Sequence, residues 1–161
     1  MVHDVLELSR RDRVQPEPIR VRRYLLTFIE EFARNEGQIP GESFSVEAGD
    51  DVTVEFDRAH LNQVLWNLLH NAWRHCRRLA GSVRIAASRR ANRVELHVID
   101  DGDGVPKALQ AQLFEPFFTT FASGTGLGLY IARELCAANG ASLDYLDRGS
   151  GADFRILWQE Q

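Results

Sequence analysis

Residues 61–72 read LNQVLWNLLHNA, and this stretch carries two kinds of information at once. Its leucines, valine and alanine recur at intervals of three and four, which is the spacing of one buried face of an α-helix. Asn67 and Asn71 are four residues apart and share a second part of the helix surface, which Arg74 and His75 continue one turn later. The stretch therefore predicts a core helix with a polar line along one side.

Working outward, further periodic segments predict the rest of the fold. Apolar residues from Val21 to Phe32 predict a second helix, and a third is expected from Gly126 to Asn139. Alternating residues predict strands at 44–48, 52–56, 83–87, 94–98, 142–147 and 152–158. Because helices and strands are mixed without strict alternation, we expect an α+β two-layer sandwich. It would have one mixed, mostly antiparallel sheet with about three helices on one face.

Two glycine clusters flank a long loop that is rich in phenylalanine. Asp100–Gly104 follows an expected strand, and Gly124–Gly128 precedes an expected helix. Glycines allow close backbone approach to a ligand, and a helix N-terminus attracts phosphate. Neither cluster completes a dinucleotide fingerprint, because Lys107 and Leu129 occupy the third glycine positions, and no P-loop is present. Together the clusters favour a nucleotide bound beneath a lid.

Composition limits the possibilities. The chain has 161 residues, the length of a single domain, and a net charge of -4, which gives no reason to expect nucleic acid as a partner. The two cysteines form no C-x-x-C pair, and no apolar run is long enough to span a bilayer. We expect residues 1–15 to be the end of a helix with its linker, and 16–161 to be one folded domain.

Four ordered blocks resemble the sensor histidine kinases. Residues 61–72 resemble their N box, 100–106 their G1 box, 113–120 their F box and 124–129 their G2 box. The resemblance runs from about Val21 to the end of the chain and implies the left-handed ATP-binding fold shared with gyrase, a heat-shock chaperone and mismatch-repair ATPases. It also implies ATP and Mg²⁺ as cofactors.

The resemblance assigns a role to each matching position. Asp100 would accept the adenine amino hydrogen in a pocket shaped by Gly102 and Gly104. Asn71 would hold Mg²⁺, Arg74 would contact phosphate, and His75 would lie near the ribose or adenine. The positions that would wrap the triphosphate are Gly124, Thr125, Gly126, Leu127, Gly128 and Leu129. The positions that would anchor the lid are Phe117 and Phe118.

Asn67 separates family members by mechanism. Members that hydrolyse ATP with water carry glutamate four residues before the metal-binding asparagine, and that position is Asn67 here. A neutral amide cannot take a proton from water, which disfavours a stand-alone ATPase and an anti-sigma serine kinase. It fits a kinase whose acceptor is an imidazole. We therefore place Asn67, Asn71 and Arg74 at the catalytic centre of a protein-histidine kinase.

The phosphoacceptor itself is not evident. None of the five histidines lies in the family's acceptor motif, so the acceptor is expected upstream, on a dimerisation domain. His97 is expected at the surface. The segment around Leu6–Arg10 resembles the corresponding helix end of nitrogen-regulation and type IV pilus sensors. A response regulator would receive the phosphate, and the chain would be the cytoplasmic domain of a parent anchored in a bacterial inner membrane.

A second function stays open. The missing acceptor, and Phe121 where related kinases often carry lysine, also fit a nucleotide-gated or degenerate module that docks on a partner without transferring phosphate.

Overall fold

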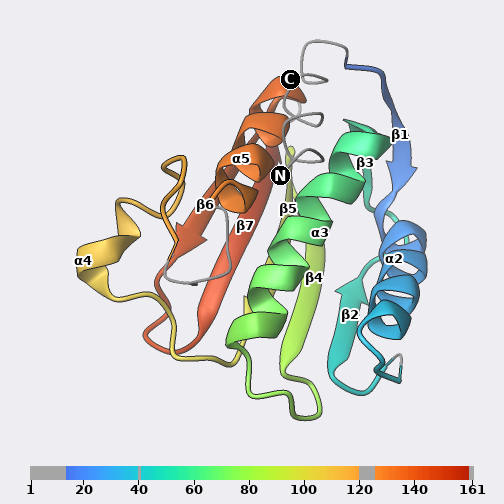
Figure 1. Ribbon diagram of the computed structural model, residues 1–161. Coiled ribbons are helices and arrows are strands. Elements are labelled where there is room, and N and C mark those ends of the chain that lie inside the picture. The colour runs from blue at the N-terminus through green and yellow to red at the C-terminus, as the bar shows by residue number, and fades with distance from the viewer. Residues whose placement is uncertain (1–13, 40, 120–125, 160–161) are drawn as a thin grey trace.

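The computed structural model describes residues 14–39, 41–119 and 126–159. Its main sheet has the strand order β2-β4-β5-β7-β6, in which β2 and β4 are parallel and all other neighbours are antiparallel (Figure 1). The five strands are β2 (Phe44–Ala48), β4 (Val83–Arg90), β5 (Arg93–Asp100), β6 (Ala141–Leu146) and β7 (Ala152–Gln159). The expected mixed, mostly antiparallel sheet is confirmed.

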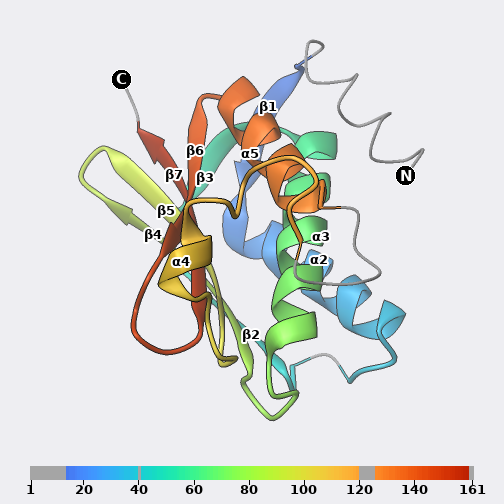
Figure 2. The same ribbon diagram turned by 60° about the vertical axis from the view of Figure 1, so that its left-hand side comes forward.

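Three long helices cover one face of this sheet, as Figures 1 and 2 show. They are α2 (Val21–Asn35), α3 (Arg58–His75) and α5 (Gly128–Ala138). A single short helix, α4 (Lys107–Gln110), interrupts the long loop after β5. The α+β sandwich expected from the mixed helix and strand patterns is therefore confirmed.

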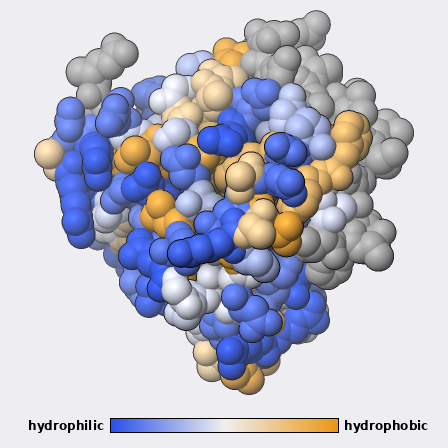
Figure 3. Space-filling view, turned by 90° about the vertical axis from the view of Figure 1, so that its left-hand side faces the viewer, coloured by the Kyte–Doolittle hydropathy of each residue, from blue (hydrophilic) through white to orange (hydrophobic). Residues whose placement is uncertain are grey.

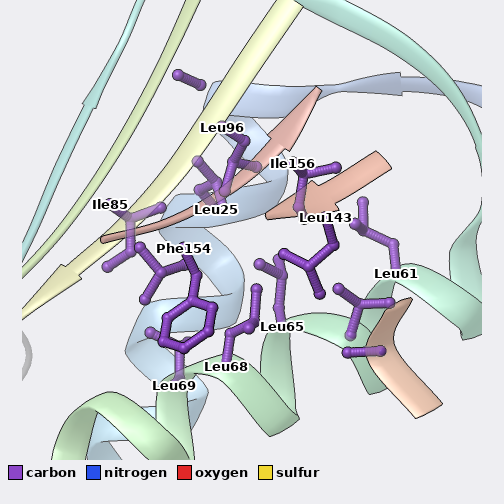
Figure 4. Packing of buried hydrophobic residues seen from close by; sticks show 14 of the residues in the cluster. Leu25, Leu61, Leu65, Leu68, Leu69, Ile85, Leu96, Leu143, Phe154 and Ile156 are labelled. Carbon is purple, nitrogen blue, oxygen red and sulfur yellow. The ribbon is translucent and has the colours of Figure 1, made fainter. Parts of the chain in front are cut away.

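The core lies between the helices and the sheet (Figure 4). Leu65 and Leu69 from α3 meet Ile85, Leu96 and Phe154 from the strands, and all are at most 2% exposed. Each such side chain stabilises the fold by roughly 1.5–3 kcal/mol. The helical stripe and the alternating strands are thus complementary surfaces of one core.

A second, two-stranded sheet was not expected from the sequence. β1 (Pro16–Arg20) pairs antiparallel with β3 (Thr53–Asp57), opposite Ile19 lies Val54, and both are buried. Proline lacks an N–H and is tolerated at a sheet edge, which allows Pro16 and Pro18 to stand in this strand. The strands flanking Gly49 and Asp50 consequently join different sheets.

Asp57 fastens the start of α3. Its carboxylate caps the helix by accepting from the His60 N–H at 3.1 Å, as the sequence predicts for an N-cap, and its other oxygen accepts from the Gln15 N–H at 3.0 Å. Burial acts to raise the pKa of Asp57, but these backbone donors outweigh it and hold the pKa below its usual range. The chain upstream of β1 is thereby tied to α3.

His97 faces outward, as expected, yet its side chain is only 14% exposed. Its Nδ1 lies 2.8 Å from Oδ1 of Asp153, whose other oxygen accepts from Arg148 Nε at 2.7 Å. Asp153 is fully buried, which acts to raise its pKa, but His97 and Arg148 outweigh that effect and lower it. Asp153 on β7 is thus bonded both to His97 on β5 and to Arg148 in the turn before β7.

Candidate functional site

The first element of the site is Asp100, the last residue of β5. Strand alternation turns it toward the helices, and it is 4% exposed. Its Oδ1 accepts from the Gly102 N–H at 2.9 Å. Burial raises the pKa of this carboxyl above its usual range, against the smaller opposite effect of the Gly102 donor. A buried carboxylate whose donors are backbone N–H groups can still receive a hydrogen bond from a ligand.

The loop after Asp100 packs backbone to backbone against its surroundings. A Cβ added to Gly102 would lie 2.2 Å from the His75 carbonyl oxygen, at the end of α3. Gly104 has φ +75°, and a Cβ there would lie 2.6 Å from the Gly151 carbonyl oxygen. Both positions therefore require glycine, and they hold the loop between α3 and the turn before β7.

Two further residues support this loop and were missed from the sequence. A Cβ on Gly151 would lie 2.1 Å from the Asp100 carbonyl oxygen, and Tyr145 accepts the Val105 N–H at 3.1 Å. The pair Gly149 and Gly151, between two expected strands, was a usable signal for a tight turn. Nothing in the sequence indicated Tyr145, because its contact spans 40 residues.

Asp101 was likewise missed as a supporting residue. Its carboxylate accepts from the Arg77 N–H and from the Ser82 hydroxyl, each at 2.8 Å. Burial acts to raise its pKa, but these donors outweigh burial and lower it. Asp101 thus fastens the segment after α3 to the segment after β5.

The polar line on α3 is present, but its members differ in their surroundings. Asn71 is half-buried, and its backbone carbonyl oxygen lies 2.8 Å from Nδ1 of His75. Among the described residues no side chain bonds the Asn71 carboxamide, which leaves its oxygen available to a ligand. Arg74 and His75 are exposed at the end of the helix.

Asn67 is engaged differently. Its Nδ2 donates to the carbonyl oxygen of Gly128, the first residue of α5, at 2.9 Å. Its Oδ1 accepts from Nε2 of Gln63 at 3.0 Å. The middle of α3 is therefore bonded to the start of α5.

The start of α5 meets the segment that precedes residues 120–125. The Phe117 N–H donates to the Gly126 carbonyl oxygen at 2.9 Å, and a Cβ on Gly126 would lie 2.3 Å from the Phe117 carbonyl carbon. The Phe117 ring is 73% exposed, while Phe118 packs against the core. Phe117 thus contacts the start of α5 through its backbone. The candidate residues Gly124 and Thr125, and Phe121, lie outside the described residues.

At the α5 N-terminus the backbone donors are not capped by a side chain. Leu127 occupies the cap position without a side-chain hydrogen bond and is buried, and Leu129 is half-buried. Gly126, just before it, has φ +75°, a conformation that glycine adopts at no cost. The helix dipole makes this end favourable for an anion.

Two separate segments therefore contact α3. Gly102 lies against its C-terminal end and Gly128 against its middle, while Phe117 packs on Gly126, just before Gly128. Figure 2 shows the loop after β5 and α5 beside α3. Figure 3 views the side of α4, where apolar residues are scattered among hydrophilic ones on the described part of the surface. The arrangement combines a buried carboxylate, a helix N-terminus and an amide oxygen.

A separate groove of about 520 Å³ lies between α2 and α3, lined by Phe28, Phe32 and Trp66 among others. Gln63 is the one residue it shares with the contacts above. None of its lining residues is a glycine, so it does not offer the chemistry of the glycine clusters. Within the described ranges, no group of three or more His, Cys, Asp or Glu residues could hold a metal ion. Asn71 alone would supply one oxygen ligand, which is how Mg²⁺ is bound when phosphates and water complete its shell.

Residues 56–161 match the family described as histidine kinase-, DNA gyrase B-, and HSP90-like ATPases. Since the match spans more than half of the chain, the chain belongs to this family. Its relatives within the family are sensor kinases. It is 40% identical to the sensor protein kinase PilS of Pseudomonas aeruginosa, over 98% of this chain and 31% of that protein. It is 32% identical to the nitrogen regulation protein NtrY of Azorhizobium caulinodans, over 73% of this chain and 16% of that protein.

Solved structures agree with this assignment. The catalytic domain of histidine kinase ThkA superposes with a TM-score of 0.74 and 28% identity, over 91% of this chain and 98% of that one. Full-length ShkA in complex with AMPPNP superposes with a TM-score of 0.75 and 28% identity, over 98% of this chain and 34% of that one. The expected likeness to the ATP-binding domain of sensor histidine kinases is confirmed. The chain spans less than a third of the curated relatives described above.

No helix in the described ranges is both long enough and apolar enough to cross a membrane.

Proposed function

We propose that this chain binds Mg-ATP and donates the γ-phosphoryl group to a histidine on a separate dimerisation domain. The observation that carries the proposal is the convergence of Asp100, the glycine-led start of α5 and Asn71 around one helix. The solved complex of ShkA, a similar protein, with the nucleotide analogue AMPPNP supports it.

Each end of the nucleotide has a suitable partner. The Asp100 carboxylate would accept from the adenine 6-amino group, in a loop that Gly102 and Gly104 hold in place. The triphosphate would lie against the backbone N–H groups of the glycine cluster that ends in Gly128. Its remaining contacts would come from Thr125, Leu127 and Leu129 on that cluster and from Arg74 and His75 on α3, with Phe117 and Phe118 holding the base of the lid.

The phosphate end also fits a divalent ion, which would screen the charge that develops on the transferred phosphoryl group. Asn71 would hold Mg²⁺ through its amide oxygen, alongside phosphate oxygens. No carboxylate replaces Asn67 on the polar line of α3, so the site lacks the base that would activate water. An imidazole needs no such base, and transfer to histidine is therefore favoured over hydrolysis.

The parent protein would supply what this chain lacks. An acceptor histidine on the dimerisation domain, a response regulator that takes the phosphate onward, and a membrane anchor in the bacterial inner membrane would all belong to other parts of the system. We propose that residues 1–15 connect to that dimerisation domain and that 16–161 form the catalytic unit.

Calorimetric titration tests the nucleotide site. We expect one-to-one binding of Mg-ADP and Mg-ATP, and a loss on the order of 1–3 kcal/mol for Asp100→Asn, since the variant presents an amide where an acceptor is needed. Inosine triphosphate provides the matched control, because its 6-oxo group accepts where adenine donates. Asp100→Asn should bind it as well as, or better than, the unaltered chain does. Equal ATP affinity for both chains would show that Asp100 does not read adenine.

If the unaltered chain bound no nucleotide, the module without phosphotransfer would become the better description.

A further inference from the structure

A hydrogen-bonded line runs from Gln63 through Asn67 to Gly128, and we propose that Asn67 is a positioning residue whose side chain sets the first turn of α5. Gln63 Nε2 donates to Asn67 Oδ1 at 3.0 Å, and Asn67 Nδ2 donates to the Gly128 carbonyl oxygen at 2.9 Å. The sequence predicts Asn67 at the catalytic centre. Its described contacts instead use both ends of its amide on protein atoms.

The chemistry of this line requires an amide. Because the Asn67 oxygen already accepts from Gln63, its NH₂ group must face Gly128, where it meets a carbonyl that can take a second donor. A carboxylate at the same place has no donor and would set negative oxygen against the Gly128 carbonyl. The hydrogen bonds of Asn67 therefore disfavour aspartate here for a reason separate from proton transfer.

The Gln63 side of the line is sheltered. Gln63 is 7% exposed, and Asn67 lies four residues further along the same helix face. A hydrogen bond kept from water loses little to competition, and its loss leaves a polar group unsatisfied. Gln63 consequently orients Asn67 rather than only contacting it.

The C-terminal end of α5 is bonded to the N-terminal end of α3. Asn139, which follows α5, accepts the Asp57 N–H at 2.8 Å, and its Nδ2 lies 3.0 Å from Nδ1 of His60. With α5 fixed at that end, the Asn67 bond determines the tilt of the end where the helix begins. That end carries the N–H groups that would face phosphate, so the effect on nucleotide rests on the proposed function.

The direct test is amide hydrogen exchange without nucleotide, comparing three variants. We expect Asn67→Ala to speed exchange in the first turns of α5, and Gln63→Ala to do so less. Asn62→Ala is the matched control, because Asn62 lies on the same helix but bonds the Tyr24 hydroxyl instead. It should leave α5 unchanged. Unaltered α5 exchange in both Asn67→Ala and Gln63→Ala would overturn the proposal.

Binding supplies the second readout. Asn67→Ala should weaken Mg-ATP roughly three- to tenfold, the size of one lost buried hydrogen bond. Gln63→Ala should weaken it less, and the double variant should match Asn67→Ala alone, since Gln63 acts through Asn67. Additive losses of affinity would mean that Gln63 does not act through Asn67, and would count against the proposal. If Asn67→Ala did not fold, Gln63→Ala would still decide the matter through α5 exchange.

The two proposals fail separately. A chain that binds no nucleotide contradicts the proposed function, while its α5 exchange still reports on Asn67.

Discussion

At the scale of single residues, the buried Asp100 carboxylate lowers the stability of the fold but is suited to binding a ligand. An ionised carboxylate that is 4% exposed, and whose nearest donors are the neutral backbone N–H groups of Gly102 and Ala152, is poorly compensated for the water it has lost. Asp153 shows the opposite balance, because a histidine and an arginine accompany it. The raised pKa of Asp100 and the lowered pKa of Asp153 follow from that difference.

Replacing Asp100 should therefore stabilise the ligand-free chain. Since burial raises the pKa of Asp100, the folded chain holds that proton more tightly, and its stability falls as pH rises through that pKa. We expect Asp100→Asn to melt at a higher temperature than the unaltered chain at pH 7. The difference should shrink as the pH falls through the raised pKa of Asp100 and vanish below about 3.9, the ordinary aspartate value.

Asp153→Asn is the control of opposite sign. The lowered pKa of Asp153 means that its ionised form stabilises the fold above the ordinary aspartate pKa, and that this stability is lost as pH falls through the lowered value. Asp153→Asn should therefore melt lower at pH 7. A lower melting temperature for Asp100→Asn as well would show that its carboxylate is better compensated than its burial suggests.

Some residues of the site can be recognised from a local sequence pattern, and others are revealed only by contacts with residues far along the chain. Gly102 and Gly104 stand out in sequence because glycine clusters are rare and mark close approach. Asp101 looks like one more acidic residue of the cluster, since Arg77 and Ser82 are 24 and 19 residues away. Local patterns reveal which residues can do chemistry, and distant contacts decide which of them hold the site in shape.

At the scale of elements, the turn between β6 and β7 packs against the loop that follows Asp100 and supports it. Gly151 and Gly104 pack backbone to backbone, and the hydroxyl of Tyr145, on β6, accepts from the Val105 N–H. The turn itself is bent by Asp147, which accepts from the Gly149 N–H at 3.0 Å. Nucleotide affinity should therefore depend on a turn that has no place in the four sequence blocks.

Two glycines of this turn offer a matched comparison. Both have positive φ, +80° at Gly149 and +66° at Gly151, but only a Cβ on Gly151 would meet other atoms, at 2.1 Å. Alanine at either site carries a strain of about 1–2 kcal/mol. Only Gly151→Ala should also displace the Asp100 loop and weaken Mg-ADP in calorimetry. Equal loss of affinity in both variants would show that the turn does not support the pocket.

Elements with their own periodicity could be predicted, and those defined by pairing could not. α2 and α3 have apolar stripes of more than two turns, and β2 matches its predicted bounds. β1 contains two prolines and no alternation, so only its register with β3 makes it a strand. Periodicity reports on the face that a segment buries, but it carries no information on which neighbour it will meet.

At the scale of the whole molecule, the described histidines are occupied in the fold. His60 is 2% exposed, His97 is paired with Asp153, and His70 packs edge-on to Phe32 and Trp66. Burial lowers the pKa of His70. His75 lies inside the proposed site, 2.8 Å from the Asn71 carbonyl. The fold thus gives His60, His70 and His97 structural contacts, while His75 lies where the nucleotide is proposed to bind.

The chain should therefore not label itself. Incubated with Mg²⁺ and γ-labelled ATP, it should acquire no acid-labile phosphate, whereas a separately purified acceptor domain added to the mixture should. Asn71→Ala should abolish that transfer while the fold persists by circular dichroism. Phosphohistidine found on this chain would contradict the assignment of the acceptor to another domain.

The place of β7 in the sheet bears on how the protein is made. β7 lies between β5 and β6, although it is the last described strand of the chain. On the ribosome, β5 can pair early with β4 across a short turn, but its other edge stays open until residues 152–159 emerge. An open, apolar strand edge invites pairing with other chains. Stalling or premature termination just before β7 would thus yield an aggregation-prone product, and chaperone contact should concentrate in that interval of synthesis.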